Sequence, residues 1–222
     1  KAMVREINLT SLADAKLGAA VGLCAPFHVR MVWLANSPKL TDAGLFHLAT
    51  LPNLERLHLF NCEQVTGSGL THLTSLKNLR ELRLSGCNAN EAGIVHVTQL
   101  AHLQELHVRP HTFNRALGLP YAKVTDKTLV RVAALSNLTT LTLGGCVDVT
   151  NAGLVHVGSM RNLQNLSLSC CTWLTDEGLA HVAALKEQYE SAGSAAVVKS
   201  SDKSDAATVH FEAQLRCEVI DI

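Results

Sequence analysis

The chain has 222 residues, with 19 lysines and arginines against 19 aspartates and glutamates, so its formal net charge is +0. This balance argues against non-specific nucleic-acid binding, which needs a positive field. Hydrophobic residues make up 47% of the chain, enough for a continuous core, but no apolar run approaches the ~18 residues of a membrane span. We therefore expect neither a nucleic-acid partner nor a membrane partner.

One motif recurs along the chain at a nearly constant spacing. It starts with a run in which apolar residues occupy the first, fourth and sixth positions, as in Leu54, Leu57 and Leu59. The first apolar position of each copy falls at Val4, Val29, Leu54, Leu79, Leu103, Leu138 and Leu163. The successive spacings are 25, 25, 25, 24, 35 and 25 residues, and such a period is typical of a solenoid.

Each copy is predicted to contain a short strand followed by a helix. The beginning of a copy has the spacing of a strand, and the second half has apolar residues three apart, as in Leu70, Leu73 and Leu76. In five copies a threonine precedes the helix as its predicted N-cap, which suits the acidic residue that often follows it. These caps are Thr41, Thr66, Thr125, Thr150 and Thr175, and the fourth copy has Asn90-Glu91 instead.

A cysteine follows the strand in four copies, which read L-x-x-L-x-L-x-x-C: Leu54–Cys62, Leu79–Cys87, Leu138–Cys146 and Leu163–Cys171. With these motifs, residues 4–186 resemble the leucine-rich repeat family, specifically its cysteine-containing subclass, as in F-box-associated leucine-rich repeat proteins. The resemblance implies an α/β fold, a right-handed leucine-rich repeat solenoid or horseshoe. Parallel strands would line its concave face, and helices its convex face, because packed helices need more room than neighbouring strands.

The repeated cysteines are interpreted as buried structural thiols. They occupy one repeat position that turns inward, where a thiol can pack and donate weakly to the backbone. A metal site is the minor alternative, because the chain has no C-x-x-C pair. Free thiols indicate a reducing intracellular compartment, and we expect the cytoplasm. Cys170, beside Cys171, is the candidate for a reactive thiol.

Histidine also recurs, at one helical position in five copies: His47, His72, His96, His156 and His181. Neighbouring helices lie ~8–10 Å apart, which is too far for two such side chains to share one ion. We interpret them as boundary residues of amphipathic helices, with a pH-responsive stripe as the alternative. No metal and no cofactor are expected.

The first and fifth copies and the tail depart from the pattern. Strand residues begin at Val4 with no cap before them, so we expect another element or a partner to cover that end. The fifth copy carries ten extra residues within Thr112–Lys123, including Phe113, Arg115 and Tyr121. Insertions in a solenoid lie on one surface and often bind partners, although a solvated loop is the alternative.

We divide the chain into a solenoid of about seven repeats at 1–186, a flexible low-complexity insertion at 187–208 and a terminal segment at 209–222. The insertion is rich in Ala, Ser, Lys and Asp. The terminal segment is predicted to be either an eighth repeat strand or a terminal strand that pairs with the last repeat.

The outward residues of the predicted strands can be aligned in columns. The central column is Asn8, Trp33, His58, Arg83, His107, Thr142 and Ser167, and the next column includes Phe60 and Arg109. Exposed aromatic residues and arginines are typical of an interface core, so the candidate partner site comprises Trp33, His58, Phe60, Arg83, His107 and Arg109. The neighbouring column adds Met31, Arg56, Glu81 and Glu105, whose acidic members partly neutralise it.

These features predict a non-catalytic scaffold that binds a protein within a larger assembly. No phosphate loop, nucleophile motif or zinc-protease motif occurs, so we expect no enzymatic activity and no small-molecule substrate. The alternative, suggested by the repeat subclass, is the substrate-recognition part of a ubiquitin-ligase adaptor of the SCF type.

Overall fold

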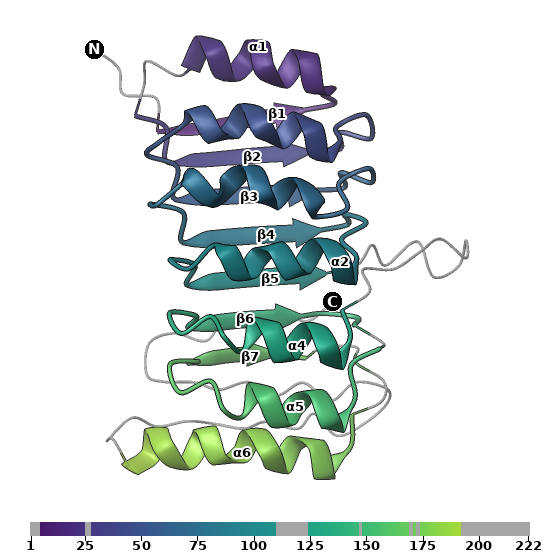
Figure 1. The fold of residues 1–222 in the computed structure, drawn as a ribbon, viewed down its shortest axis with the longest axis vertical. Coiled ribbons are helices and arrows are strands. Elements are labelled where there is room, and N and C mark those ends of the chain that lie inside the picture. Colours follow the sequence, from purple (N-terminus) through teal and green to yellow (C-terminus); the bar gives the residue numbers. More distant parts are fainter. Residues whose placement is uncertain are drawn as a thin grey trace.

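The computed structural model describes residues 5–24, 28–109, 124–146, 148–168, 171 and 174–191. Seven parallel strands form one sheet in chain order, and the helices lie together on one of its faces (Figure 1). The strands are β1 (Glu6–Thr10), β2 (Met31–Ala35), β3 (Arg56–Phe60), β4 (Glu81–Ser85), β5 (Glu105–Arg109), β6 (Thr140–Leu143) and β7 (Asn165–Ser167). This arrangement is an α/β leucine-rich repeat solenoid, as the repeat predicted.

The helical layer is not uniform. The α-helices are α1 (Asp14–Cys24), α2 (Glu91–Ile94), α4 (Asp126–Val132), α5 (Asn151–Val157) and α6 (Asp176–Ser191). Repeats two and three instead carry the 3-10 helices η1 (Asp42–Thr50) and η2 (Ser68–Ser75), and in repeat four α2 is followed directly by the 3-10 helix η3 (Val95–Gln99). Apolar residues three apart suit the 3.0 residues per turn of a 3-10 helix, so one side chain per turn reaches the core.

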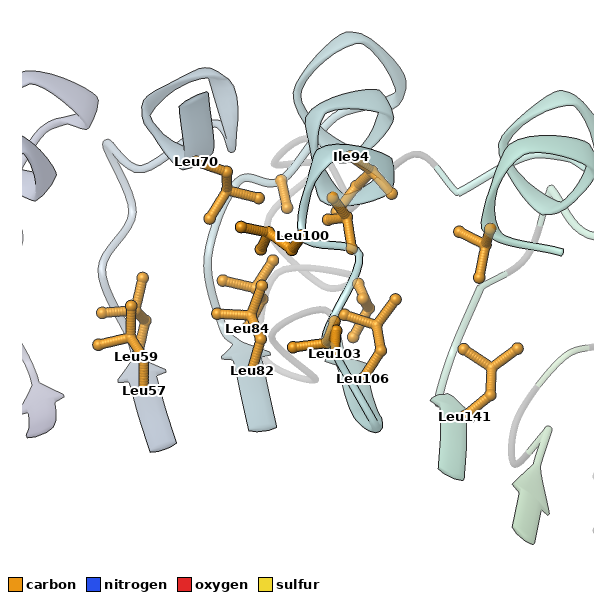
Figure 2. Close-up of a cluster of buried hydrophobic side chains, with 14 of the residues drawn as sticks. Leu57, Leu59, Leu70, Leu82, Leu84, Ile94, Leu100, Leu103, Leu106 and Leu141 are labelled. Atoms are coloured by element: carbon orange, nitrogen blue, oxygen red, sulfur yellow. The ribbon is translucent and has the colours of Figure 1, made fainter. Parts of the chain in front are cut away.

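Leucine side chains fill the space between the two layers. Leu57 and Leu59 of β3 and Leu82 and Leu84 of β4 are at most 1% exposed, and their side chains lie between strands and helices in Figure 2. Leu70 of η2 closes this layer from the helical side. The core is therefore one continuous aliphatic stack, which each repeat extends by the same few side chains.

The chain leaves most strands through a residue with a positive φ. Asn36 and Asn61 have φ of 48° and 52°, and Gly86 has φ of 68°. Asparagine and glycine tolerate this left-handed conformation best, which accounts for their recurrence after the strand. The backbone N–H of each also donates to the next repeat, for example from Asn36 to the carbonyl of Phe60 at 2.8 Å. The sharp turn thus also links successive repeats.

The cysteine position is buried, as predicted. Cys62, Cys87, Cys146 and Cys171 are at most 5% exposed. The Sγ atoms of Cys62 and Cys87 each donate to a carbonyl of the preceding repeat, Leu34 O at 3.8 Å and Leu59 O at 3.7 Å. Ser37 holds the equivalent position in repeat two, where its hydroxyl donates to Ala35 O and accepts from Leu12 N.

Carboxylates in the first helical turn connect neighbouring repeats. Asp14 accepts from both the backbone N–H and the hydroxyl of Thr41, at 2.8 and 2.6 Å, and Asp126 does the same with Thr150. Thr41 and Thr150 also cap their own helices, as predicted. The prediction was wrong for Thr66, because Gly67 is the N-cap of η2 and the Thr66 hydroxyl is held by Asp42 of the preceding repeat.

The recurrent glycine at the start of each helix permits this close stacking. A Cβ at Gly153 would lie 2.3 Å from Asp126 Oδ1, and one at Gly69 would lie 2.5 Å from the carbonyl oxygen of Asp42. These glycines therefore serve contact between repeats.

Helices α1 and α6 lie at the two ends of the described solenoid. Helix α1 continues through Gly22 to Cys24, and α6 continues to Ser191. The rest of the expected insertion and the whole terminal segment lie outside the described residues, so the domain boundaries stay predictions. Strand β1 lies at the edge of the described sheet, and what covers it stays a prediction as well. Among the described helices, none combines the length and apolar character that crossing a membrane requires.

Candidate binding surface on the strand face

The strand register confirms the central column that the repeat predicted. Asn8 pairs with Trp33, Trp33 with His58, and His58 with Arg83. The row continues through His107, Thr142 and Ser167. In a parallel in-register sheet, these side chains leave the same face at one-strand intervals. Residues that are 24 to 35 positions apart in the sequence, one from each neighbouring repeat, therefore form one surface.

Two large aromatic side chains stand out on this face. Trp33 on β2 is 42% exposed and Phe60 on β3 is 44% exposed. Trp33 packs edge-on against the ring of His58, with the ring centroids 5.8 Å apart. The backbones of Trp33 and Phe60 are fixed in the sheet, so their two rings have little conformational freedom to lose when a partner binds.

A buried carboxylate organises the centre of the face. Glu81 on β4 is only 8% exposed, and its Oε1 lies 2.9 Å from His58 Nε2 and accepts from Arg83 Nε. Burial raises the pKa of Glu81, but hydrogen bonds from His58 and Arg83 and the charge of Arg83 outweigh it and lower the pKa to about 2. Glu81 is thus an ionised anchor for two neighbouring side chains.

His107 on β5 has a similar but looser setting. Its Nδ1 lies 2.9 Å from the hydroxyl of Thr142, and its Nε2 lies 3.5 Å from Glu105 Oε2. His58 and His107 are both half-buried, whereas the sequence placed them among the exposed anchors. Polar groups on adjacent strands hold the two imidazole rings close to the sheet. We therefore assign His58 and His107 a supporting role in the candidate site and do not count them among its exposed anchors.

The accessible charges are divided across the face. Arg83 and Arg109 are exposed in the central and following columns. The column on the other side carries Glu105, whose side chain is 42% exposed, and Arg56, which pairs with Glu6 at 3.4 Å. Sequence reasoning named these residues but not the burial of Glu81, which removes that acid from the accessible surface. The strand register could have indicated this burial, because it places Glu81 between Arg56 and Glu105 of the neighbouring strands and close to His58.

The remaining candidates, Phe113, Arg115 and Tyr121 of the inserted segment, lie outside the described residues and stay predictions. The recurrent histidines do lie on the helical layer, one in each of η1, η2, η3, α5 and α6. On that layer Phe46 of η1 is 58% exposed and packs edge-on against His72, a contact that sequence reasoning missed.

One group of side chains has the composition of a cation site. Within the described part, potential ligand atoms of Glu81, Glu105 and His107 all lie within 4.8 Å of one another. The guanidinium of Arg83 already neutralises Glu81, and an ion would have to displace it. We therefore interpret these charged groups as contacts that stabilise the strand face.

Comparison with known proteins finds similarity to a leucine-rich repeat in one part of the chain. A family model described as a leucine-rich repeat matches residues 159–183, the span from the loop before β7 into α6. No curated protein matches the chain. Among solved structures, the crystal structure of an internalin (inlF) from Listeria monocytogenes is similar, with 18% sequence identity and a TM-score of 0.42. The match covers 79% of this chain and 56% of the internalin, so the chain spans little more than half of that protein's length.

Proposed function

We propose that this chain is a non-catalytic scaffold that binds a protein partner through its concave strand face, as one subunit of a larger assembly. The observation that carries the proposal is the exposure of Trp33 and Phe60, 42% and 44%, on adjacent strands of a rigid sheet. Leucine-rich repeat proteins in general bind protein partners, and their extended concave surface suits that task.

The surroundings of the two rings support the same conclusion. Binding hot spots are typically tryptophan, tyrosine or arginine at the centre of an interface, surrounded by less important contacts that exclude water. Here Arg83 lies within two strands of Trp33, and its headgroup is held in place by Glu81. A partner would thus meet pre-positioned aromatic and cationic groups and lose little conformational entropy in ordering them.

The test compares Trp33→Ala and Phe60→Ala with Phe46→Ala, a matched control because Phe46 is exposed on the helical face. Partners are captured from the source cells with tagged wild-type chain, identified by cross-linking mass spectrometry, and their affinities for each variant are then measured. We expect Trp33→Ala to weaken the native partner by ~2 kcal/mol or more, about thirtyfold, and Phe46→Ala to leave it unchanged. Equal affinities for all three variants would refute the concave assignment.

The same cross-links address two finer proposals. Links from the partner to the segment Thr112–Lys123 would support its predicted role in binding. The second candidate function, substrate recognition for a ubiquitin ligase, rests on the cysteine-containing repeat alone. Stable co-purification of ligase core subunits would favour it over the general scaffold.

A further inference from the structure

We propose that the concave face takes an acidic amphipathic helix, which lies across strands β2 to β5 with its apolar residues on Trp33 and Phe60 and its carboxylates on Arg83 and Arg109. This inference rests on the proposed function and specifies the chemistry of the partner at that site.

The first step is the alternation of the four side chains between two columns. Trp33 and Arg83 belong to the central column, whereas Phe60 and Arg109 belong to the next one, two residues further along their strands. Taken strand by strand from β2 to β5, the order is Trp33, Phe60, Arg83, Arg109, with a change of column at each step. The two aromatic residues come first and the two arginines follow.

The second step is the spacing. Neighbouring strands are ~4.8 Å apart, so the four positions lie at about 0, 4.8, 9.6 and 14.4 Å across the sheet. A helix rises 1.5 Å per residue, so positions i, i+3, i+7 and i+10 lie at about 0, 4.5, 10.5 and 15 Å. Residues at these positions also alternate between the two sides of a helical stripe, as a and d positions do in a coiled coil. One straight helix can therefore address all four side chains.

The third step is charge. The nearest carboxylate to Arg83 is that of Glu81, which is 8% exposed and accepts a hydrogen bond from Nε, the inner nitrogen of the guanidinium. The two terminal nitrogens of Arg83 take no part in that bond. Arg109 is exposed and forms no ion pair with any residue that the structure describes. Both arginines suit a partner carboxylate, which a guanidinium can bind through two parallel hydrogen bonds.

The side chains between the anchors leave room for such a helix. His58 and Ser85 separate each aromatic residue from its arginine within a column, and both are half-buried. A ring and a hydroxyl therefore lie between the anchors, with Ala35 beside Phe60. Beyond β5 the central column continues with Thr142 and Ser167, which are too small to obstruct the helix.

The experiment uses a displayed library of helical peptides in which positions i, i+3, i+7 and i+10 of one face are randomised, selected on the whole chain. We expect enrichment of apolar residues at the first two positions and of Asp or Glu at the last two. A selected peptide should bind Arg109→Gln about tenfold more weakly than wild type, since hydrogen bonds between charged groups are the strong ones. Its affinity should also decrease as the NaCl concentration is raised from about 0.05 M to about 0.5 M, because salt screens exposed charges. Arg131→Gln, on the helical face in α4, is the matched control and should bind like wild type.

Several results would overturn the inference. These are enrichment of basic residues at i+7 and i+10, acidic peptides that bind Arg109→Gln and wild type equally, or no enrichment at all. Selected peptides that need Trp33 and Phe60 but carry no acidic residue would also refute it, while leaving the concave scaffold intact. The scaffold itself fails only if the native partner ignores Trp33→Ala and Phe60→Ala, so the two failures are distinguishable.

Discussion

Asp42 in the first turn of η1 accepts hydrogen bonds from Thr66 of the next repeat with both of its carboxylate oxygens. The Thr66 hydroxyl donates to Oδ2 at 2.6 Å, and the Thr66 backbone N–H donates to Oδ1 at 3.2 Å. The hydroxyl of Ser68 and the N–H of Gly67 donate to the same carboxylate. Burial raises the pKa of Asp42, but the hydrogen bonds from Thr66 and Ser68 outweigh it, so the pKa is lowered. The clamp is therefore charged at neutral pH and joins repeats two and three.

This clamp makes Asp42→Ala a destabilising change. Removing the carboxylate leaves several donors at the repeat junction without their acceptor, and we expect a loss of ~1–3 kcal/mol in the free energy of unfolding. Urea denaturation monitored by circular dichroism measures it. Glu63→Ala, at an exposed loop position after β3, is the control and should change stability by less than ~0.5 kcal/mol. Equal losses in the two variants would show that the clamp contributes nothing measurable.

Glu81 predicts how stability depends on pH. Its pKa is about 2 in the folded chain, below the ordinary value of 4.5, so the unfolded state binds the proton more readily. Its contribution is therefore complete above pH 4.5 and is lost as the pH falls from about 4.5 towards 2. Glu81→Gln should cost ~1–2 kcal/mol at pH 7, because neutral hydrogen bonds replace charge-assisted ones.

Unfolding of wild type and Glu81→Gln at pH 7, 4 and 3 tests this assignment. The difference in unfolding free energy should narrow as the pH falls. A difference that stays constant down to pH 3 would mean that Glu81 is not ionised against His58 and Arg83 in the folded state.

A pair of glycine substitutions separates repeat stacking from helix propensity. A Cβ at Gly69 would lie 2.5 Å from the carbonyl oxygen and 2.8 Å from the Cα of Asp42, so the backbones of two repeats must move apart. We expect Gly69→Ala to cost ~2 kcal/mol or more. A Cβ at Gly22 in α1 has nothing within 4 Å, and Gly22→Ala should be neutral or stabilise by up to ~1 kcal/mol. Thermal melting of both variants measures the two changes in stability. A Gly69→Ala variant that is as stable as wild type would contradict the close approach of the two backbones.

The cysteines should react in an order set by burial. Burial raises the pKa of Cys146, and the adjacent thiol of Cys62 together with burial raises that of Cys87. Cys24, at the end of α1, is half-buried and should be alkylated by iodoacetamide before either of them. Peptide mapping by mass spectrometry after timed labelling reports the order, with labelling in urea as the control. Rapid labelling of Cys87 in the folded chain would refute the packed position.

The sequence predicted the structure correctly for those features that follow from the repeat period alone. A spacing of 25 residues brings identical positions into neighbouring strands, so the sequence alone aligns Trp33, His58 and Arg83. The inward cysteines followed from the same count. The repeat thus predicted correctly that the candidate anchors on the described strands share the strand face. That this face binds a partner stays a prediction.

The repeat pattern did not predict how side chains of different repeats contact one another. That Glu81 is buried against His58 of the preceding repeat, and that the side chains of His58 and His107 are only 13% and 15% exposed, depends on rotamers that each side chain adopts against its neighbours. The diversion of Thr66 from capping its own helix to binding Asp42 is of the same kind. A linear pattern states which positions share a face, but not which polar groups satisfy one another across it.

The sequence by itself determined the strand order, the register and the inward or outward direction of each strand residue, because a short repeat leaves each unit only its neighbours to stack on. The tertiary structure alone decided the helix type in repeats two to four, the carboxylate clamps between repeats, and which outward residues remain accessible to a partner. These depend on differences of a few tenths of an ångström in the distances between groups in adjacent repeats, and such differences follow from packing that no single repeat contains.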